Sequence, residues 1–200
     1  MLNDTLTAVR IGVFGGTFDP VHNGHLAAAA ETRHRLRLDE LLVVPAADPW
    51  QKHGQVVAAA EDRYAMVKAA FADVDGVTVS RVELDRDGPT YTVDTLRALA
   101  APDRALVLVV GADAVQGLAT WRAVDEIRSR CELAIVTRAG DEQPKPPDGD
   151  WRATVVEIPR LDISSTDLRD RLAAGRPVDG LMPEAAIRVV AQRRLYTRTR

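Results

Sequence analysis

Two histidines, His22 and His25, are the side chains of this sequence with the clearest capacity for chemistry. They stand three residues apart, about one helical turn, so both rings can face the same position. Gly15 and Gly16 precede them directly after an apolar, strand-like run, and glycine lets a backbone approach a ligand closely. A helix that begins near Gly24 would direct its free N–H groups and the positive end of its dipole at an anion. The stretch therefore predicts a site for one phosphate-sized anion.

Simpler interpretations of the same residues stay open. Paired glycines usually mark a tight turn, and a lone helical histidine is more often structural than catalytic. Two histidines at this spacing also suit zinc, but the sequence offers no Cys, Asp or Glu cluster to complete such a site. The common nucleotide-binding patterns, GxGxxG and GxxxxGK followed by Ser or Thr, are absent from this stretch. The anion site is favoured by the combination of glycines, helix start and two imidazoles at one strand-to-helix junction.

A second candidate is the run ISSTDLR near the carboxyl end. Ser164 with Asp167 three residues later is similar to a capping box, with Asp in place of the usual Glu or Gln. The run could also serve a ligand, because N–H groups at a helix start, the Ser165 and Thr166 hydroxyls and the Arg169 guanidinium all suit phosphate oxygens. The two roles are compatible, and we expect the Asp167 carboxylate to point away from any phosphate.

Short apolar runs alternate with longer helical ones around these two candidates. The apolar runs predict strands at Ile11–Phe14, Leu41–Pro45, Val77–Leu84, Leu106–Val110, Leu133–Thr137 and Thr154–Ile158. The other runs predict helices at His25–Leu36, Glu61–Asp73, Val93–Ala100, Ala114–Arg130, Ser165–Ala174 and Pro183–Arg193. Strands that are apolar throughout indicate a parallel sheet covered by helices on both faces.

We therefore expect an α/β protein with a Rossmann-like, doubly wound, mainly parallel sheet and C-terminal helices. In such folds ligands bind beyond the carboxyl ends of the strands, where the strand order reverses, so the loops after the first and fourth strands should form the site. The 200 residues fit one compact domain. Within it we expect an N-terminal tail at 1–10, a mobile loop at 139–150, rich in proline and charge, and a C-terminal helical part at 159–196.

Composition limits the kinds of partner. The formal net charge is −3, whereas a general nucleic-acid binder usually has a basic excess, so any phosphate chemistry should be confined to a small pocket. The single cysteine, Cys131, excludes an intramolecular disulfide and suits a reducing compartment. No apolar run reaches the ~18 residues that span a bilayer, and the first residues lack the apolar core of a secretory signal. We expect a cytoplasmic protein that binds neither a nucleic-acid polymer nor a membrane.

The run GGTFDPVHNGH, which ends at His25, resembles the signature of the nicotinate mononucleotide adenylyltransferases of the HxGH nucleotidyltransferase superfamily. In that family the two histidines, here His22 and His25, contact the ATP phosphates and stabilise charge in the transition state. The resemblance further implies ATP contacts by Gly15, Gly16, Thr17 and Phe18. The run ISSTDLR is similar to the family's ISSTxxR motif, which implies that Ser165, Thr166 and Arg169 hold the β- and γ-phosphates.

Between these motifs, the likeness to the family covers roughly Ile11 to Tyr196. Gly111 and Asp113 resemble the family's adenosine ribose site, where an acid pairs with two hydroxyls; a turn with a helix cap is the alternative. Trp121 matches a ring that stacks on the pyridine of the acceptor in the family. Arg138, just after the fifth strand, is a further candidate for a nucleotide contact, although by itself it suits a solvated loop.

The run PTYTVDT resembles the family's segment near the nicotinate group, which implies that Tyr91 and Thr92 bind the acceptor. Thr92 is also a candidate helix N-cap. The sequence departs from the family at Trp50–His53, where many relatives have Pro-Pro-His followed by Lys or Arg. Lys52 matches the basic position and is assigned to the acceptor, while Gln51 stands where histidine is common.

The resemblance implies transfer of AMP from ATP to nicotinate mononucleotide, giving nicotinate adenine dinucleotide and pyrophosphate, a step of NAD biosynthesis. The acceptor phosphate is already a competent nucleophile at neutral pH, so the reaction needs no general base and no covalent intermediate. The sequence agrees, because it shows no convincing Ser-His-Asp or Cys-His arrangement. Magnesium would arrive with ATP and keep waters and phosphate ligands, with no metal site made by the protein alone.

Two alternatives differ in function. The acceptor could be nicotinamide mononucleotide or phosphopantetheine, although the enzymes of phosphopantetheine are usually shorter and lack the TYTVDT run and the tryptophan after GAD. The chain could also be a nucleotide-sensing protein that keeps the pocket without turnover. The intact histidines and the intact ISSTDLR argue against that class.

Overall fold

One parallel sheet organises the molecule. The computed structural model describes residues 8–49, 57–142, 144–145 and 148–197. Its strands are β1 (Val9–Gly16), β2 (Glu40–Pro45), β3 (Val77–Val79), β4 (Arg104–Gly111), β5 (Cys131–Arg138) and β6 (Ala153–Ile158). Its helices are α1 (Asn23–Arg35), α2 (Ala60–Ala70), α3 (Thr92–Leu99), α4 (Ala112–Val115), α5 (Val124–Arg130), α6 (Ser165–Ala173) and α7 (Glu184–Arg193), with a 3-10 turn at Leu118–Thr120.

The strand order is β3-β2-β1-β4-β5-β6, and every neighbouring pair runs parallel. The chain builds outward from β1 to β3 and then returns to place β4 on the other side of β1. The order therefore reverses between β1 and β4, which is the point where such sheets bind ligands. The prediction of a doubly wound, mainly parallel sheet is confirmed, and its order reverses at the strands after which the sequence predicts the site.

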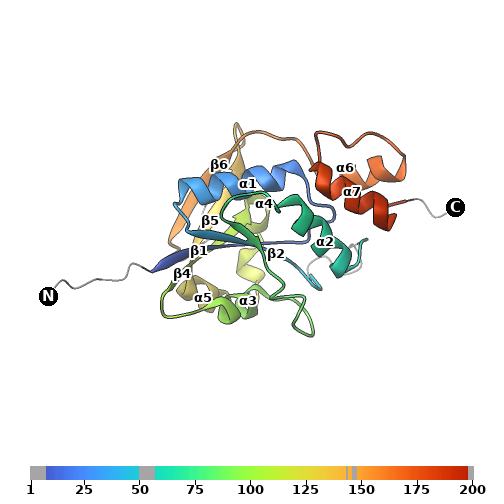
Figure 1. Cartoon of the computed structure of the whole chain (residues 1–200). Helices are drawn as coiled ribbons and strands as arrows, with labels where there is room; N and C mark the ends of the chain where they lie inside the picture. The colour runs from blue at the N-terminus through green and yellow to red at the C-terminus, as the bar shows by residue number, and fades with distance from the viewer. Residues whose placement is uncertain (1–7, 50–56, 143, 146–147, 198–200) are drawn as a thin grey trace.

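Two apolar cores, one on each face of the sheet, explain why the strands are apolar throughout. On one face β4 contributes Val107 and Val109 to a core with α1, α2, α6 and α7. On the other face Leu106, Leu108 and Val110 pack with α3 and α5. Figure 1 shows α1 over one face and α3 and α5 over the opposite face. Helices α6 and α7 lie at the end far from the N-terminus, and α7 packs against α2. Burial on both faces makes the sheet a rigid platform for the loops at its carboxyl edge.

Some predicted elements differ from those of the structure, and three of these differences change the course of the chain. The strand expected at Val77–Leu84 ends at Val79, because the chain then turns and buries Glu83 instead of continuing the edge strand. The single helix expected at Ala114–Arg130 is broken into α4, the 3-10 turn and α5, and Ala123 adopts a left-handed conformation with φ 53° just before α5. The tail expected at 1–10 is too long, since β1 already begins at Val9.

Within the described part of the chain, the structure has no helix that is long and apolar enough to cross a membrane.

Candidate active site

A cleft of about 250 Å³ opens at the carboxyl edge of the sheet, at the point where the strand order reverses. Its walls come from β1, β2 and β4, from the segment before α3, and from the segment between α4 and α5. Predicted residues of both substrates share this cleft. They are Gly15, Gly16, Thr17 and Gly111 for ATP, and Tyr91, Thr92 and Trp121 for the acceptor. The charged side chains that line it are Glu83 and Arg122, neither of which the sequence singled out.

The last two residues of β1 and the loop that follows them, residues 15–22, lead into α1 and bring the two histidines together. We call this segment the phosphate loop. His22 is the N-cap of α1, and its backbone N–H donates to Nδ1 of His25 at 3.2 Å. The two rings are stacked with centroids 3.7 Å apart, and the ring of Phe18 meets His25 edge-on at 4.9 Å. Because Nδ1 of His25 accepts a hydrogen bond, its proton lies on Nε2, which makes that atom a donor.

His22 is held neutral in the free protein. Burial and, to a smaller extent, the positive charge of Arg138 at the end of β5 together lower its pKa to about 4. Its Nδ1 is buried and has no hydrogen-bond partner among the described residues. The charge of Arg138, the last residue of β5, therefore acts on the His22 ring at the start of α1. An arriving phosphate would bring negative charge to this neutral ring and favour its protonated form.

Gly24 makes room for the His22 ring. A Cβ added at Gly24 would lie 3.0 Å from Nδ1 and 3.1 Å from Cε1 of His22, so the ring would have to move by a few tenths of an ångström. The absence of a side chain at Gly24 therefore lets the His22 ring pack closely against the helix backbone.

We expect Gly24→Ala to lower kcat by ~10-fold, because small displacements of a reacting group are costly. Thermal stability should not fall from the backbone change, since alanine favours a helix by up to about 1 kcal/mol over glycine. The matched control is Gly117→Ala, where the nearest atom would be a carbonyl oxygen at 3.8 Å. Steady-state kinetics of both variants decide the matter, and equal kcat values would show that His22 needs no such room.

The run ISSTDLR forms the start of α6, beside the phosphate loop. Ser164 caps the helix by accepting from the N–H of Asp167 at 3.1 Å, so the capping half of the prediction is confirmed. Asp167 does not complete a reciprocal box; its carboxylate accepts from Arg171 at 2.6 Å instead. Ser165 Oγ donates to the carbonyl of Pro20 at 2.9 Å, which ties α6 to the phosphate loop.

Arg169 already touches the phosphate loop without any ligand. Its Nη1 donates to the Asp19 carbonyl at 2.7 Å, and its Nη2 donates to Oγ1 of Thr166 at 3.1 Å. Arg169 is half-buried, and these two hydrogen bonds hold its guanidinium in place. These contacts place the hydroxyls and the guanidinium of α6 next to the loop that carries His22.

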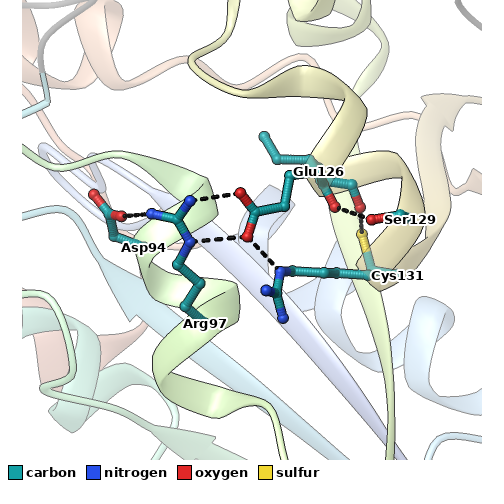
Figure 2. A network of polar contacts seen from close by, with 7 residues as sticks. Asp94, Arg97, Glu126, Ser129 and Cys131 are labelled. Atoms are coloured by element: carbon teal, nitrogen blue, oxygen red, sulfur yellow. Dashed lines mark hydrogen bonds and ion pairs between the residues drawn. The ribbon is translucent and has the colours of Figure 1, made fainter.

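An ion-pair network holds α3 against α5 and so fixes the outer wall of the cleft. Figure 2 shows Arg97 between Asp94 and Glu126, with bonds of 2.8 Å to Asp94 and 2.9 Å to Glu126. Arg130 also donates to Glu126, at 2.7 Å, and these two arginines lower the pKa of Glu126 to about 2. Above this wall the guanidinium of Arg122 lies over the ring of Tyr91, 4.7 Å from its centroid.

Glu83 is a buried acid in the wall of the cleft, with a side chain 6% exposed. Burial raises its pKa to about 7, against hydrogen bonding by Thr95 and the charges of Arg86 and Arg63, which lower it. Thr95 Oγ1 donates to its Oε1 at 2.5 Å. The carboxyl group therefore takes up a proton in the folded protein at a pH where it would be ionised in the unfolded chain.

This raised pKa predicts a pH-dependent contribution to stability. Between about pH 5 and pH 7 the folded state holds a proton that the unfolded state has released, so the free energy of unfolding falls as pH rises through that window. Relative to Glu83→Gln, which cannot ionise, the wild type should lose up to about 1.4 kcal/mol per pH unit there. Denaturant unfolding of both proteins across this range gives the difference. Parallel curves would mean that Glu83 has an ordinary pKa.

Among the described residues, Asp113 and Phe18 are predicted ATP contacts that do not line the cleft. Asp113 is exposed in the first turn of α4 and does not line the cleft, whereas Gly111 does. Phe18 is buried, with φ 51°, so any contact that it makes with ATP must use its backbone. Helix α3 has Tyr91 at its N-cap, one residue before the Thr92 expected there. Lys52 lies outside the described residues.

Sequence reasoning missed the residues that support the phosphate loop. Asp19, Arg63 and Tyr196 are all buried. Arg63 donates to the backbone carbonyl of Thr17, and Tyr196 donates to the carboxylate of Asp19. One signal was available: Arg63 stands on the stripe of α2 that also holds Met66, Val67 and Ala70, and a cation in an apolar stripe needs buried partners. No comparable signal marks Tyr196, which is 177 residues from Asp19.

A parallel sheet of this order, with a glycine-containing loop at its reversal point, belongs to the doubly wound, Rossmann-like folds. A family model described as cytidylyltransferase-like matches residues 13–171. Relatives in Streptomyces coelicolor (46% identity; 91% of this chain and 98% of the relative) and Acidothermus cellulolyticus (43% identity; 95% of each) are both named "Probable nicotinate-nucleotide adenylyltransferase". The chain belongs to the nicotinate-nucleotide adenylyltransferase family.

Solved structures share the fold. The Plasmodium falciparum nicotinic acid mononucleotide adenylyltransferase in complex with NaAD matches with a TM-score of 0.77 at 17% identity, over 94% of this chain and 97% of that one. The same enzyme complexed with APC matches with a TM-score of 0.75 over 94% of this chain and 96% of that one. At this identity the likeness concerns the arrangement of the sheet and its helices.

Proposed function

We propose that this chain transfers AMP from ATP to nicotinate mononucleotide and releases pyrophosphate, a step of NAD biosynthesis. An oxygen of the acceptor's 5′-phosphate attacks the α-phosphorus of ATP and forms the new P–O bond. The bond from the α-phosphorus to the oxygen that bridges to the β-phosphate breaks, and its electrons leave with pyrophosphate. The acceptor phosphate needs no deprotonation by the protein, so the task of the protein is positioning and stabilisation of charge.

The observation that carries the proposal is a single cleft with two kinds of wall. One wall is the backbone of the phosphate loop at Gly15, Gly16 and Thr17. The space beside Gly15 is open, so phosphates can approach the backbone closely there. The other wall has the ring of Trp121 and the start of α3 at Thr92, where a pyridine ring and its carboxylate can bind. Both substrates would then meet at the carboxyl edge of the sheet, with their phosphates beside α1.

In this proposal His22, His25 and the N-terminus of α1 stabilise the charge that grows on the α-phosphate. The proton on Nε2 of His25 makes it a hydrogen-bond donor without any change of charge, and Arg138 adds a positive charge at the same point. Helix dipoles and oriented N–H groups favour the anion further. All of these donors are in place before the substrate binds, which limits the reorganisation needed during reaction.

The leaving pyrophosphate would be held by Ser165, Thr166 and Arg169 at the start of α6. Their contacts with the Pro20 and Asp19 carbonyls support this role, because they bring α6 to the loop that carries the histidines. The ribose of the adenosine would lie at Gly111 and Asp113. The proposal treats the chain as a single domain, since the helical part after residue 159 supplies groups to the same site.

Tyr91, Thr92 and Trp121 would bind the acceptor, and we retain Lys52 as a candidate acceptor contact. Among the described residues, no group of three or more His, Cys, Asp or Glu side chains gathers to hold a metal ion. We propose that a magnesium ion arrives with ATP, bound by its phosphates and by water, and that it neutralises charge on the leaving group. We propose the cytosol as the site of the reaction, where both substrates would be available.

The test is an assay of pyrophosphate release with ATP, magnesium and a panel of acceptors. We expect rapid release with nicotinate mononucleotide and little or none with phosphopantetheine or without acceptor. Release with phosphopantetheine alone would replace the acceptor in this proposal. Binding of ATP without release for any acceptor would indicate a nucleotide-sensing protein instead of an enzyme.

A further inference from the structure

Arg63, on α2, is the most deeply buried cation of the described chain, with 1% of its surface exposed. Burial lowers its pKa, although the nearby charge of Asp19 acts in the opposite direction. Its guanidinium donates to three backbone carbonyls: Nη1 to Thr17 at 2.8 Å, Nη2 to Ala47 at 3.1 Å and Nε to Ala58 at 3.1 Å. Burying a charge is costly unless its donors are satisfied. The three hydrogen bonds satisfy the guanidinium, and they also fix the positions of the three carbonyl groups relative to one another.

The three carbonyls belong to two segments that are separate in the sequence. Thr17 is part of the phosphate loop and lies 46 residues from Arg63. Ala47 and Ala58 stand at the two ends of the connection between β2 and α2, which we call the loop ends. Ala46 and Pro49, beside the first loop end, line the cleft. One planar group therefore holds the phosphate loop and the loop ends in a fixed relation.

Asp19, two residues after Thr17, also connects the phosphate loop to the second of the loop ends. Its carboxylate is 4% exposed and accepts from the N–H groups of Val57 at 2.8 Å and Ala58 at 3.1 Å. It also accepts from the phenol of Tyr196 at 2.7 Å, while its backbone carbonyl accepts from Arg169 at 2.7 Å. The loop ends, the phosphate loop and the start of α6 thus form one continuous hydrogen-bonded unit.

We propose that Arg63 is a positioning residue that couples the two substrate sites. Acceptor bound against the loop ends then favours the conformation of the phosphate loop that binds ATP, and bound ATP favours binding of the acceptor. This inference rests on the proposed function, because it takes the acceptor to bind beside Ala46 and Pro49. Coupling between sites is reciprocal and is commonly ~5–150-fold in affinity. Lysine cannot replace arginine here, since an ammonium group lacks the planar fork that reaches carbonyls in three directions.

The test measures the dissociation constant of nicotinate mononucleotide with and without a non-hydrolysable ATP analogue. In the unsubstituted protein we expect the analogue to tighten acceptor binding at least ~5-fold. In Arg63→Lys the dissociation constants of the acceptor with and without the analogue should differ by less than about twofold, and kcat should drop at least ~10-fold. The matched control is Arg188→Lys on α7, an exposed arginine paired with Glu184, which should leave both quantities unchanged.

A thermal melt separates positioning from stability. If Arg63→Lys loses thermal stability but keeps its coupling and kcat, the residue is only structural and the inference is overturned. If that variant does not fold, Tyr196→Phe removes a single hydrogen bond to Asp19, and it should lower the coupling while its melting temperature stays above the assay temperature. Unchanged coupling in Tyr196→Phe would then overturn the inference. Absence of turnover in the unsubstituted protein would instead refute the proposed function. The binding measurement needs no turnover, so the two failures can be told apart.

Discussion

Replacement of His22 at the end of the phosphate loop, or of His25 in the first turn of α1, should lower kcat by ~10²–10³, the usual loss when one donor to a developing charge is removed. His22→Ala and His25→Ala remove different donors, yet the rings are stacked 3.7 Å apart and act on one position. The losses should therefore be less than additive in the double variant, as is usual for residues that work as a unit. The fold should be retained, because both residues lie at a loop–helix junction.

Steady-state kinetics at saturating ATP and acceptor provide the measurement. His34→Ala is the matched control, since that histidine is exposed in the last turn of the same helix. It should behave as the unsubstituted protein. Turnover within about threefold of wild type in both His22→Ala and His25→Ala would remove the histidines from the mechanism, whatever role the rest of the loop plays.

Selectivity for the acid acceptor is the second large effect that we expect. Nicotinate and nicotinamide mononucleotide differ only in carboxylate against carboxamide, so groups near that substituent must discriminate. The N–H groups at Thr92 and Val93 open α3 and have no carbonyl within their own helix to accept them. They and the helix dipole favour a carboxylate, while Arg122 over the Tyr91 ring adds a positive charge at the same edge of the cleft.

A carboxamide would leave one of these donors unpaired or facing its NH₂ group, at ~1–3 kcal/mol, and would lose the charge-assisted character of the bonds. We expect kcat/KM to be at least ~10² higher for the acid, because 1.4 kcal/mol corresponds to a factor of ten. The measurement compares both acceptors at saturating ATP and magnesium. Trp121→Phe serves as control, since stacking serves both acceptors alike and should change the two constants together. A ratio near one would indicate a dual-specificity pocket.

The parts of the site that could be predicted from the sequence are local ones. The phosphate loop and the start of α6 each combine a strand end, a helix start and their polar residues within a few positions, so spacing alone predicted their geometry. The strands were predictable for the same reason, because burial on both faces leaves continuous apolar runs such as β4. The alternation of strands and helices predicted a doubly wound, mainly parallel sheet, whereas the strand order comes from the structure.

The parts that could not be predicted depend on distant contacts or on exceptions to local rules. Residues 77–84 alternate like a strand, yet Glu83 is buried beside Thr95 and the chain leaves the sheet after Val79. The segment 114–130 has helical periodicity, and only Gly117 and the left-handed Ala123 show where it breaks. That break brings Trp121 and Arg122 to the cleft, which fits the general finding that local rules fail at functional sites.

The central claim is that AMP passes directly from ATP to the acceptor at the phosphate loop, with no covalent intermediate on the protein. The most direct measurement uses ATP with sulfur in place of one non-bridging oxygen of the α-phosphate, which makes the α-phosphorus a stereocentre. The configuration of that phosphorus in the dinucleotide product is then compared with that in the substrate. A single in-line attack predicts inversion. Retention would require two successive displacements, and so an intermediate on a protein side chain, which would contradict this account.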